Sequence, residues 1–160
     1  IMPKENTRMS TRIDYPDFRQ LLPAAHDALI AAGKAVDEAG LDKSLSELVK
    51  LRASQLNGCS FCLQYHLNIA RRSGVGQAKL DQLAAWRDAT VFSASERAAL
   101  AWTESLTRLP PDGVPDALYG ELREHFSEAQ IVQLSVTVAT INSWNRLGVA
   151  LRFVPPAAQL

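Results

Sequence analysis

The spacing of apolar residues constrains the fold of this chain more than any other feature. Apolar side chains recur three and four positions apart, and the first such run begins at Pro23 and continues through Ala24, Ala25, Ala28, Leu29, Ala32 and Val36. This spacing places them on one face of an α-helix, whereas the alternating pattern of a strand is absent. At 160 residues, the chain can form one domain with a hydrophobic core. We therefore expect a single-domain, all-α protein of about six to seven helices.

Capping signals and breakers set the expected helix bounds. Ser93 with Glu96 and Ser127 with Gln130 fit the Ser-x-x-Glu/Gln pattern, in which the two side chains satisfy free N–H groups of a first helical turn. The expected helices cover about 23–39, 45–56, 59–73, 78–86, 95–108, a short stretch from 115, and 128–151. We expect residues 1–12 to form a flexible segment and residues 13–160 to form the helical domain.

Composition and charge exclude several kinds of partner. The 17 Lys and Arg balance the 17 Asp and Glu, and no basic run provides a surface for nucleic acid. The most apolar stretch, residues 131–151, contains too many polar residues to face lipid, so we expect a buried helix and no membrane span. The N-terminal residues lack the apolar stretch of a secretory signal, which predicts a cytoplasmic protein.

Residues 57–66, NGCSFCLQYH, hold both cysteines and one of the three histidines. If the chain is helical from about Cys59, then Cys59, Cys62 and His66 occupy positions i, i+3 and i+7 and share one face. Two cysteines so spaced can form and open a disulfide with little backbone movement. A helix N-terminus favours a thiolate, and a nearby imidazole can accept its proton. The pattern indicates a thiol that attacks an oxidised substrate.

Glu47 is the remaining candidate for this site. An antiparallel helix pair would bring it near His66 with an axial offset of about 5 Å, which favours a hydrogen bond relayed by one water. The alternative is structural, because Ser44 and Glu47 also fit a capping box. Spacing alone does not choose between them.

The cysteine pair has other interpretations. The cysteines could simply pack in a core. A zinc site would need a further ligand from His26, His125 or a carboxylate, and we expect no metal and no bound cofactor. Covalent haem attachment is excluded because Leu63, not histidine, follows the second cysteine, and a thioredoxin motif would follow a strand.

Large aromatic and polar residues elsewhere have structural explanations. Trp86, Trp102 and Trp144 are expected in the core or at an interface. We expect a contact between subunits to satisfy the polar side chains in the last helix, namely Asn142, Asn145 and Arg146.

The candidate site residues resemble the signature of the AhpD-like alkylhydroperoxidases in the carboxymuconolactone decarboxylase superfamily. That signature is a Glu, eleven intervening residues, Cys-x-x-Cys, three more residues and a His, and Glu47, the cysteine pair and His66 match it in type and spacing. The likeness extends from about residue 13 to 152, through ELVKLRASQLNG, ARRSG, WRDATVFSASERAALAWTE and INSWNRLGVALR. It implies a helical subunit that forms trimers or hexamers. It also implies that Cys62 is the peroxidatic cysteine, Cys59 the resolving one, His66 the base and Glu47 the proton acceptor behind it.

Two details qualify the resemblance. Some AhpD proteins have a histidine between the cysteines, where this chain has Phe61. The superfamily's decarboxylases lack the cysteine pair, so lactone decarboxylation is a remote alternative. We expect a thiol peroxidase that reduces a hydroperoxide, is recycled by an external dithiol and forms a homo-oligomer. The competing hypothesis is a non-enzymatic redox sensor or stress-response scaffold that uses the same cysteines.

Overall fold

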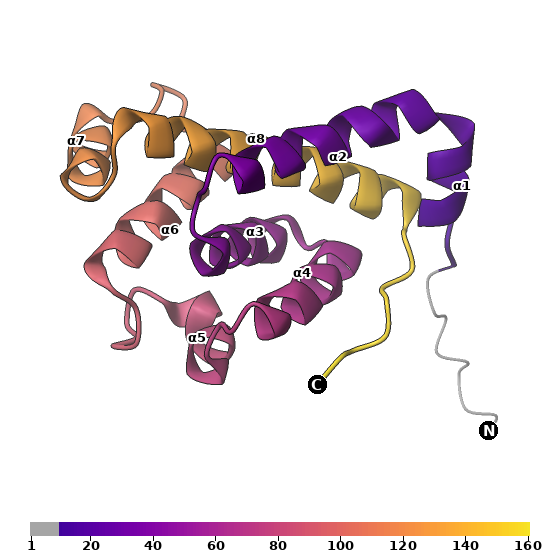
Figure 1. Cartoon of the computed structure of the whole chain (residues 1–160), viewed down its shortest axis with the longest axis horizontal. Coiled ribbons are helices and arrows are strands. Elements are labelled where there is room, and N and C mark those ends of the chain that lie inside the picture. Colours follow the sequence, from indigo (N-terminus) through magenta and orange to yellow (C-terminus); the bar gives the residue numbers. More distant parts are fainter. Residues whose placement is uncertain (1–9) are drawn as a thin grey trace.

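The computed structural model describes residues 10–160, which form eight α-helices and one short 3₁₀-helix, with no strand in that range (Figure 1). The helices are α1 (Tyr15–Leu21), α2 (Pro23–Glu38), α3 (Lys43–Asn57), α4 (Ser60–Arg72), α5 (Gln77–Gln82), η1 (Leu83–Ala85), α6 (Ala94–Thr107), α7 (Asp116–His125) and α8 (Glu128–Leu151). The all-α prediction is confirmed, with one helix more than expected. Of the segment 1–12 that we expected to be flexible, residues 1–9 lie outside the described part.

Helix α1 is the element that the sequence analysis missed. The Asp14 side chain accepts a hydrogen bond from the N–H of Tyr15, and Pro16 occupies the first turn, where it needs no hydrogen-bond partner. Phe18 anchors the helix by burying its ring. The N–H groups of Arg12 and Ile13 both donate to the carbonyl of Leu151, which ties this end of the domain to the end of α8.

Both predicted capping boxes are confirmed, and the alternative capping role of Glu47 is absent. Complete capping boxes open α6 at Ser93 and α8 at Ser127. Helix α3 instead begins at Lys43, with the Asp42 side chain accepting from the N–H of Leu45. Ser44 donates its hydroxyl to the carbonyl of Ser73. Glu47 therefore has no capping role, because a better N-cap lies two residues before Ser44.

Helix α3 is the central helix of the domain. It packs against α4, α6 and α8, and Figure 1 shows it between the α2–α8 pair and α4. Its buried residues point in several directions around the helix: Leu45, Ser46, Glu47, Leu48, Val49, Leu51, Ala53 and Ser54. A helix enclosed in this way buries its polar side chains as well as its apolar ones, and these need partners inside the protein.

A tight turn places α4 beside α3. Gly58 ends α3 in the left-handed conformation (φ 65°), which glycine adopts without the penalty of a Cβ atom. The N–H of Cys59 then donates to the carbonyl of Ser54, so the chain folds back alongside the last turn of α3. Glu47 lies seven residues before Ser54, and His66 lies seven residues after Cys59. The two side chains are thus at the same level of an antiparallel pair.

Helix α8 is the longest, at 24 residues. Its apolar side buries Ile131, Leu134, Val138 and Ile141. None of the helices described for residues 10–160 is both long and apolar enough to cross a bilayer.

The polar residues of α8 find partners within the chain, so no subunit contact is needed to satisfy them. Asn145 is fully buried and donates to Ser54 Oγ, and Asn57 donates to the side-chain oxygens of both Asn142 and Asn145. Arg146 donates to the carbonyl and side-chain oxygens of Asn142. These bonds join α8 to the end of α3, which lies far away in the sequence.

Candidate active site

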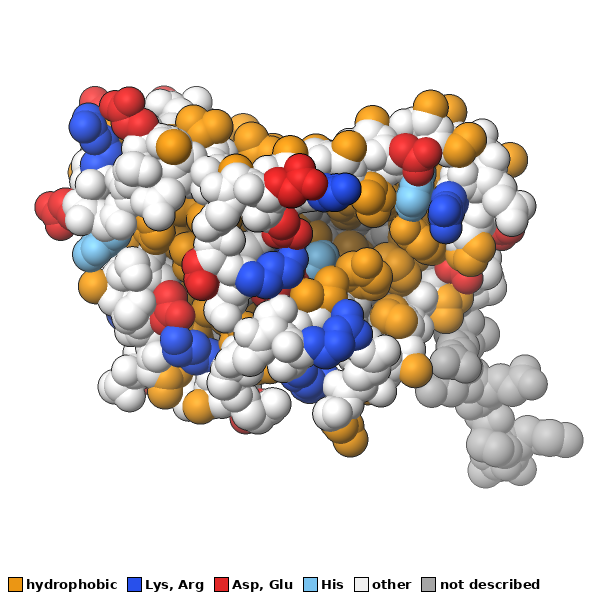
Figure 2. Space-filling model, viewed as in Figure 1, with side chains coloured by type: hydrophobic (Ala, Val, Ile, Leu, Met, Phe, Trp, Pro, Cys, Tyr) orange, Lys and Arg blue, Asp and Glu red, His pale blue; other side chains and the backbone are white. Residues whose placement is uncertain are grey.

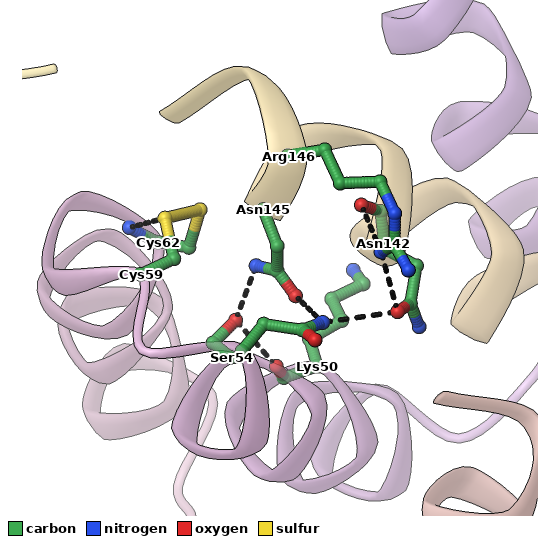
Figure 3. The surroundings of a disulfide bond; sticks show 8 residues. Lys50, Ser54, Cys59, Cys62, Asn142, Asn145 and Arg146 are labelled. Carbon is green, nitrogen blue, oxygen red and sulfur yellow. Dashed lines mark hydrogen bonds between the residues drawn. A yellow bond between two sulfur atoms is a disulfide. The ribbon is translucent and has the colours of Figure 1, made fainter. Parts of the chain in front are cut away.

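The two cysteines form a disulfide at the start of α4 (Figure 3). Both are buried, and their Cα atoms are 5.3 Å apart. Cys59 is the N-cap residue of α4, and its Sγ accepts a hydrogen bond of 3.2 Å from the N–H of Cys62. In the reduced protein the same N–H and the helix dipole would stabilise negative charge on Cys59.

The backbone of α8 closes one side of the disulfide. A Cβ atom added to Gly148 would lie 2.8 Å from Cys59 Sγ and 3.5 Å from Cys62 Sγ. The first distance is too short for a real side chain, so glycine is required for α8 to lie this close to the sulfurs. The ring of Phe153 also lies against this position. Sequence reasoning missed Gly148, although an isolated glycine inside a helical pattern often marks a close approach.

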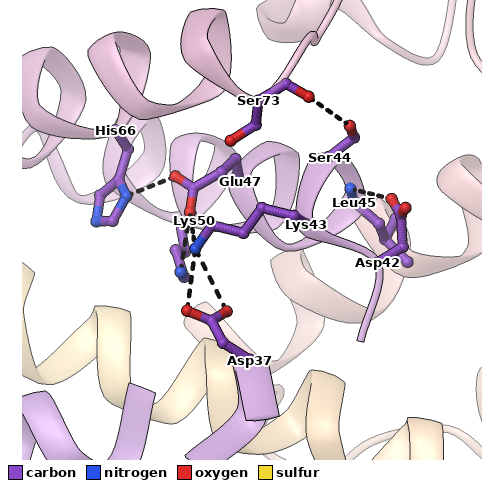
Figure 4. A network of polar contacts seen from close by, with 9 residues as sticks. All are labelled: Asp37, Asp42, Lys43, Ser44, Leu45, Glu47, Lys50, His66 and Ser73. Atoms are coloured by element: carbon purple, nitrogen blue, oxygen red, sulfur yellow. Dashed lines mark hydrogen bonds and ion pairs between the residues drawn. The ribbon is translucent and has the colours of Figure 1, made fainter. Parts of the chain in front are cut away.

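His66 and Glu47 are in direct contact (Figure 4). His66 Nδ1 lies 2.7 Å from Glu47 Oε2, so the predicted intervening water is wrong. The expected offset of about 5 Å counted the positions of Glu47 and His66 from the ends of their helices. The Cys59–Ser54 hydrogen bond shortens the turn and removes the expected axial offset.

Glu47 is an ionised carboxylate enclosed in the protein. Its side chain is 0% exposed, and its second oxygen, Oε1, forms ion pairs with Lys43 at 3.1 Å and Lys50 at 3.0 Å. Burial opposes ionisation, but the hydrogen bond from His66, the charge of the His66 ring when it is protonated in acid, and the charge of Lys50 outweigh it, and the pKa of Glu47 falls to about 2. The carboxylate is therefore charged across the physiological pH range.

His66 is held neutral and in one tautomer. Burial and the nearby ammonium groups of Lys50 and Lys43 lower its pKa, although Glu47 opposes the shift. An ionised Glu47 only accepts hydrogen bonds, so Nδ1 carries the proton and Nε2 presents a lone pair. A neutral imidazole oriented in this way can act as a general base.

A cavity of about 340 Å³ gives access to part of this site. Cys62 and His66, one helical turn apart on α4, both line it, whereas Cys59 does not. The aromatic residues in its wall are Tyr15, Phe61, Tyr65 and Trp144. Figure 2 shows the opening as a hollow with a histidine at its edge, orange apolar side chains on one side and blue basic ones on the other. A substrate in this cavity would meet the sulfur of Cys62 first.

The other candidate residues stay outside the site. His26 is buried and bonded to Tyr15 and Asp27, and His125 ends α7 on the surface. Trp86 and Trp102 are in the core as predicted, while Trp144 borders the cavity. Within residues 10–160 no group of three or more His, Cys, Asp or Glu side chains is placed to hold a metal ion.

Comparison with known proteins places the chain in a family. The model of the carboxymuconolactone decarboxylase family matches residues 23–105. The uncharacterized protein YdfG of Bacillus subtilis is 36% identical over 143 residues, which are 89% of this chain and 95% of YdfG. The chain belongs to the carboxymuconolactone decarboxylase family.

Solved structures place this family member in the AhpD-like group. A protein of unknown function from Agrobacterium tumefaciens, which its name relates to the antioxidant defence protein AhpD, superposes with a TM-score of 0.86 at 35% identity, covering 92% of this chain and 99% of that one. The debrominase Bmp8 has the same fold, with a TM-score of 0.72 at 22% identity, covering 81% of this chain and 70% of its own. The predicted resemblance is confirmed at the level of family and fold.

Proposed function

We propose that this family member is a thiol-dependent peroxidase that reduces organic hydroperoxides. The observation that carries the proposal is that Cys62 and a neutral His66 share one cavity, while Glu47 fixes the tautomer of His66 from behind. The AhpD-like fold and the Cys-x-x-Cys pair support the same conclusion. Cys62 is the attacking cysteine, because Cys59 lies outside the cavity and against Gly148.

The reaction begins from the dithiol form. His66 Nε2 accepts the proton of the Cys62 thiol, and the thiolate attacks the terminal oxygen of the hydroperoxide ROOH. The O–O bond breaks, Cys62 becomes a sulfenic acid, and the departing RO⁻ takes the proton from His66 to leave as ROH. Glu47 remains ionised throughout and stabilises the imidazolium that forms between these two steps.

The cycle then closes through Cys59. Its sulfur attacks the sulfenic acid of Cys62, the S–O bond breaks, and the hydroxyl leaves as water with the Cys59 proton. An external dithiol reduces the resulting disulfide by thiol–disulfide exchange and is itself oxidised to a disulfide. The chain has no third cysteine to pass these electrons on, so the dithiol must reach this pair directly.

Trapping the sulfenic acid tests the mechanism. We expect reduced Cys59→Ser protein, given one equivalent of cumene hydroperoxide and then dimedone, to carry one adduct on Cys62 by mass spectrometry. The Cys62→Ser variant should carry none. Unmodified thiols in the wild type after peroxide would overturn the proposal. Oxidation that stops after one equivalent despite excess dithiol would instead favour a redox sensor or scaffold.

Reductive dehalogenation is a second candidate, because four aromatic side chains line the cavity. A similarly folded protein, a variant of the debrominase Bmp8, was solved in complex with 2,3,4-tribromopyrrole. The corresponding step would have the Cys62 thiolate attack bromine, the ring take a proton, and Cys59 displace bromide. Release of bromide from a bromopyrrole by the reduced protein, without peroxide consumption, would select this reaction over the first.

A further inference from the structure

The cavity wall has a charged side that the mechanism above does not use. Three lysines line it, Lys34 on α2 with Lys43 and Lys50 on α3, and one carboxylate, Asp37, accompanies them. The rest of the wall is mostly apolar, with Leu29, Ile30, Val36, Ile69, Ile141 and Trp144. Figure 2 shows the two kinds of surface on different sides of the hollow.

The carboxylates near the three lysines leave some of the ammonium N–H groups free to bind a ligand. Lys43 lies 3.1 Å from both Asp37 and Glu47, and Lys50 lies 3.0 Å from Glu47. Lys34 is 3.5 Å from Glu38, which lies on the outer side and does not line the cavity. Each ammonium has three N–H groups, and the contacts made within residues 10–160 do not engage all of them. His66 adds no charge while it is neutral.

Ser46 adds a polar group of the same kind. It lines the cavity between Lys43 and Lys50, its side chain is buried, and its Oγ has no hydrogen-bond partner within residues 10–160. Several other helical hydroxyls donate to the carbonyl four residues earlier, as Ser54 and Thr103 do, whereas the Ser105 hydroxyl in α6 is also buried without a partner in the described residues. A buried hydroxyl without a partner is uncommon, and a small rotation would let it donate to a ligand oxygen.

The basic side chains and the reactive sulfur border the same cavity, on α2 and α3 and on α4 respectively. Lys43 precedes Glu47 by four residues, and Cys62 precedes His66 by four residues on the antiparallel helix. With Glu47 and His66 at one level, the backbone positions of Lys43 and Cys62 are about 12 Å apart along the helix axis, and the Lys43 ammonium reaches back along α3 to Glu47.

We infer that the cavity selects an amphiphilic hydroperoxide that bears a carboxylate. This inference rests on the proposed peroxidase function. The carboxylate binds at Lys34, Lys43 and Ser46, and the apolar body lies along Ile141 and Trp144. An O–O group on this body would then lie beside Cys62, which lines the same cavity. The cavity volume of about 340 Å³ is at the lower end of the roughly 300–1,000 Å³ typical of sites for organic ligands.

Binding of an unreactive acid tests the charge recognition independently of catalysis. The probes are decanoate and decanol with the oxidised protein, followed by calorimetry or by tryptophan fluorescence, since Trp144 borders the cavity. We expect decanoate to bind about tenfold more tightly than decanol, since one charge-assisted hydrogen bond has this effect. Equal affinities would overturn the inference.

Two substitutions outside the catalytic residues should act in opposite directions. Lys34→Gln should weaken decanoate binding a few fold and Asp37→Asn should strengthen it, with decanol unaffected by either. Lys79→Gln removes the same charge as Lys34→Gln from a remote ion pair with Glu96 and should change nothing. An equal effect of Lys34→Gln and Lys79→Gln would show only bulk electrostatics and would count against the inference.

Kinetics separate this inference from the proposed function. We expect kcat/KM for linoleic acid hydroperoxide to exceed that for its methyl ester about tenfold, and Ser46→Ala to reduce this ratio. Activity on both peroxides with no preference for the acid would overturn the inference alone. Absence of activity on every peroxide, with decanoate still preferred over decanol, would overturn the peroxidase proposal and leave an anionic ligand site.

Discussion

The protein contains two largely buried histidines that each pair with a carboxylate through Nδ1 but differ in the surroundings of Nε2. His66 and His26 each place Nδ1 within 2.9 Å of a carboxylate oxygen, from Glu47 and Asp27 respectively. In His26 the other nitrogen, Nε2, lies 2.7 Å from the hydroxyl of Tyr15. In His66 that nitrogen has no hydrogen-bond partner within residues 10–160, and the ring borders the cavity that holds Cys62.

The difference shows what turns a carboxylate–histidine pair into a base. At His26 both nitrogens are satisfied, Asp27 is 73% exposed, and the pair holds α1 against α2. At His66 the carboxylate is fully buried and ionised, and the lone pair of Nε2 remains available. An available nitrogen beside a thiol, rather than the pair itself, is therefore the mark of the candidate active site.

Exchange of each histidine for asparagine gives the largest expected contrast. His66→Asn should slow oxidation of Cys62 by tert-butyl hydroperoxide by about 10²- to 10⁴-fold, the usual contribution of a general base. His26→Asn should leave this rate essentially unchanged while lowering stability. Stopped-flow oxidation of the prereduced proteins measures both, and comparable losses in the two variants would contradict the comparison.

The Glu47–His66 pair should also make stability depend on pH. Burial lowers the pKa of His66 below its ordinary 6.5, and the hydrogen bond from His66 helps lower the pKa of Glu47 from 4.5 to about 2. As the pH falls below either ordinary value, the unfolded chain binds the proton first, so the folded state loses stability. We expect a loss that begins below pH 6.5 and grows below pH 4.5, with Glu47 contributing about 2 kcal/mol by about pH 3.

Urea unfolding in steps from neutral to acid pH measures this loss. The control is Glu47→Gln, which cannot titrate and should show a shallower decline over the more acidic part of the range. If the free energy of unfolding fell equally with pH in the two proteins, the Glu47 carboxylate would not be stabilised by its partners.

Neutralising each carboxylate gives a smaller contrast in rate. Glu47→Gln removes the charge that fixes the His66 tautomer and stabilises its imidazolium, and we expect oxidation of Cys62 to slow roughly ten- to hundredfold. Asp27→Asn, on the exposed carboxylate of the other pair, should leave the rate unchanged. The rate of Cys62 oxidation should be measured as a function of pH. If the pH at which the rate falls on the acid side were the same in Glu47→Gln and the wild type, Glu47 would not act through His66.

The smallest expected effect comes from Tyr15→Phe. This change keeps the ring, which stacks on Phe61, but removes the hydroxyl that pairs with His26. We expect the free energy of unfolding to fall by about 1 kcal/mol, the usual value of one hydrogen bond, with no change in the rate of Cys62 oxidation. A large loss of rate would show that Tyr15 also takes part in the chemistry, since it borders the cavity.

Local signals account for most of what the sequence predicted correctly. The capping boxes at Ser93 and Ser127, and the spacing of Cys59, Cys62 and His66, depend on neighbours within seven positions. Helix α1 also had a local signal, because Asp14 and Pro16 resemble an N-cap followed by a first-turn proline. It was overlooked because seven residues are too few to show helical periodicity, and the contact of Phe18 with residues beyond α1 holds it in place.

Contacts between distant residues account for the rest. The direct bond between Glu47 and His66 depends on how far the chain folds back at Gly58, which a count of residues to the helix ends does not capture. Asn142 and Asn145 pair with Asn57, which lies 85 and 88 positions earlier. The two candidate roles of Glu47 could be separated only once the structure showed that Asp42 caps α3.

Gly148 of α8, which lies against the disulfide, bears on how the two sulfurs can move when the disulfide is reduced. A disulfide holds its sulfurs about 2 Å apart, whereas unbonded atoms need roughly 3.5 Å or more, so reduction must push the two sulfurs away from each other. The main chain of α8 at Gly148 lies against Cys59 on one side, whereas Cys62 borders the candidate substrate cavity. In the proposed cycle, we therefore expect reduction to move the Cys62 sulfur toward the cavity and oxidation by the peroxide to move it back.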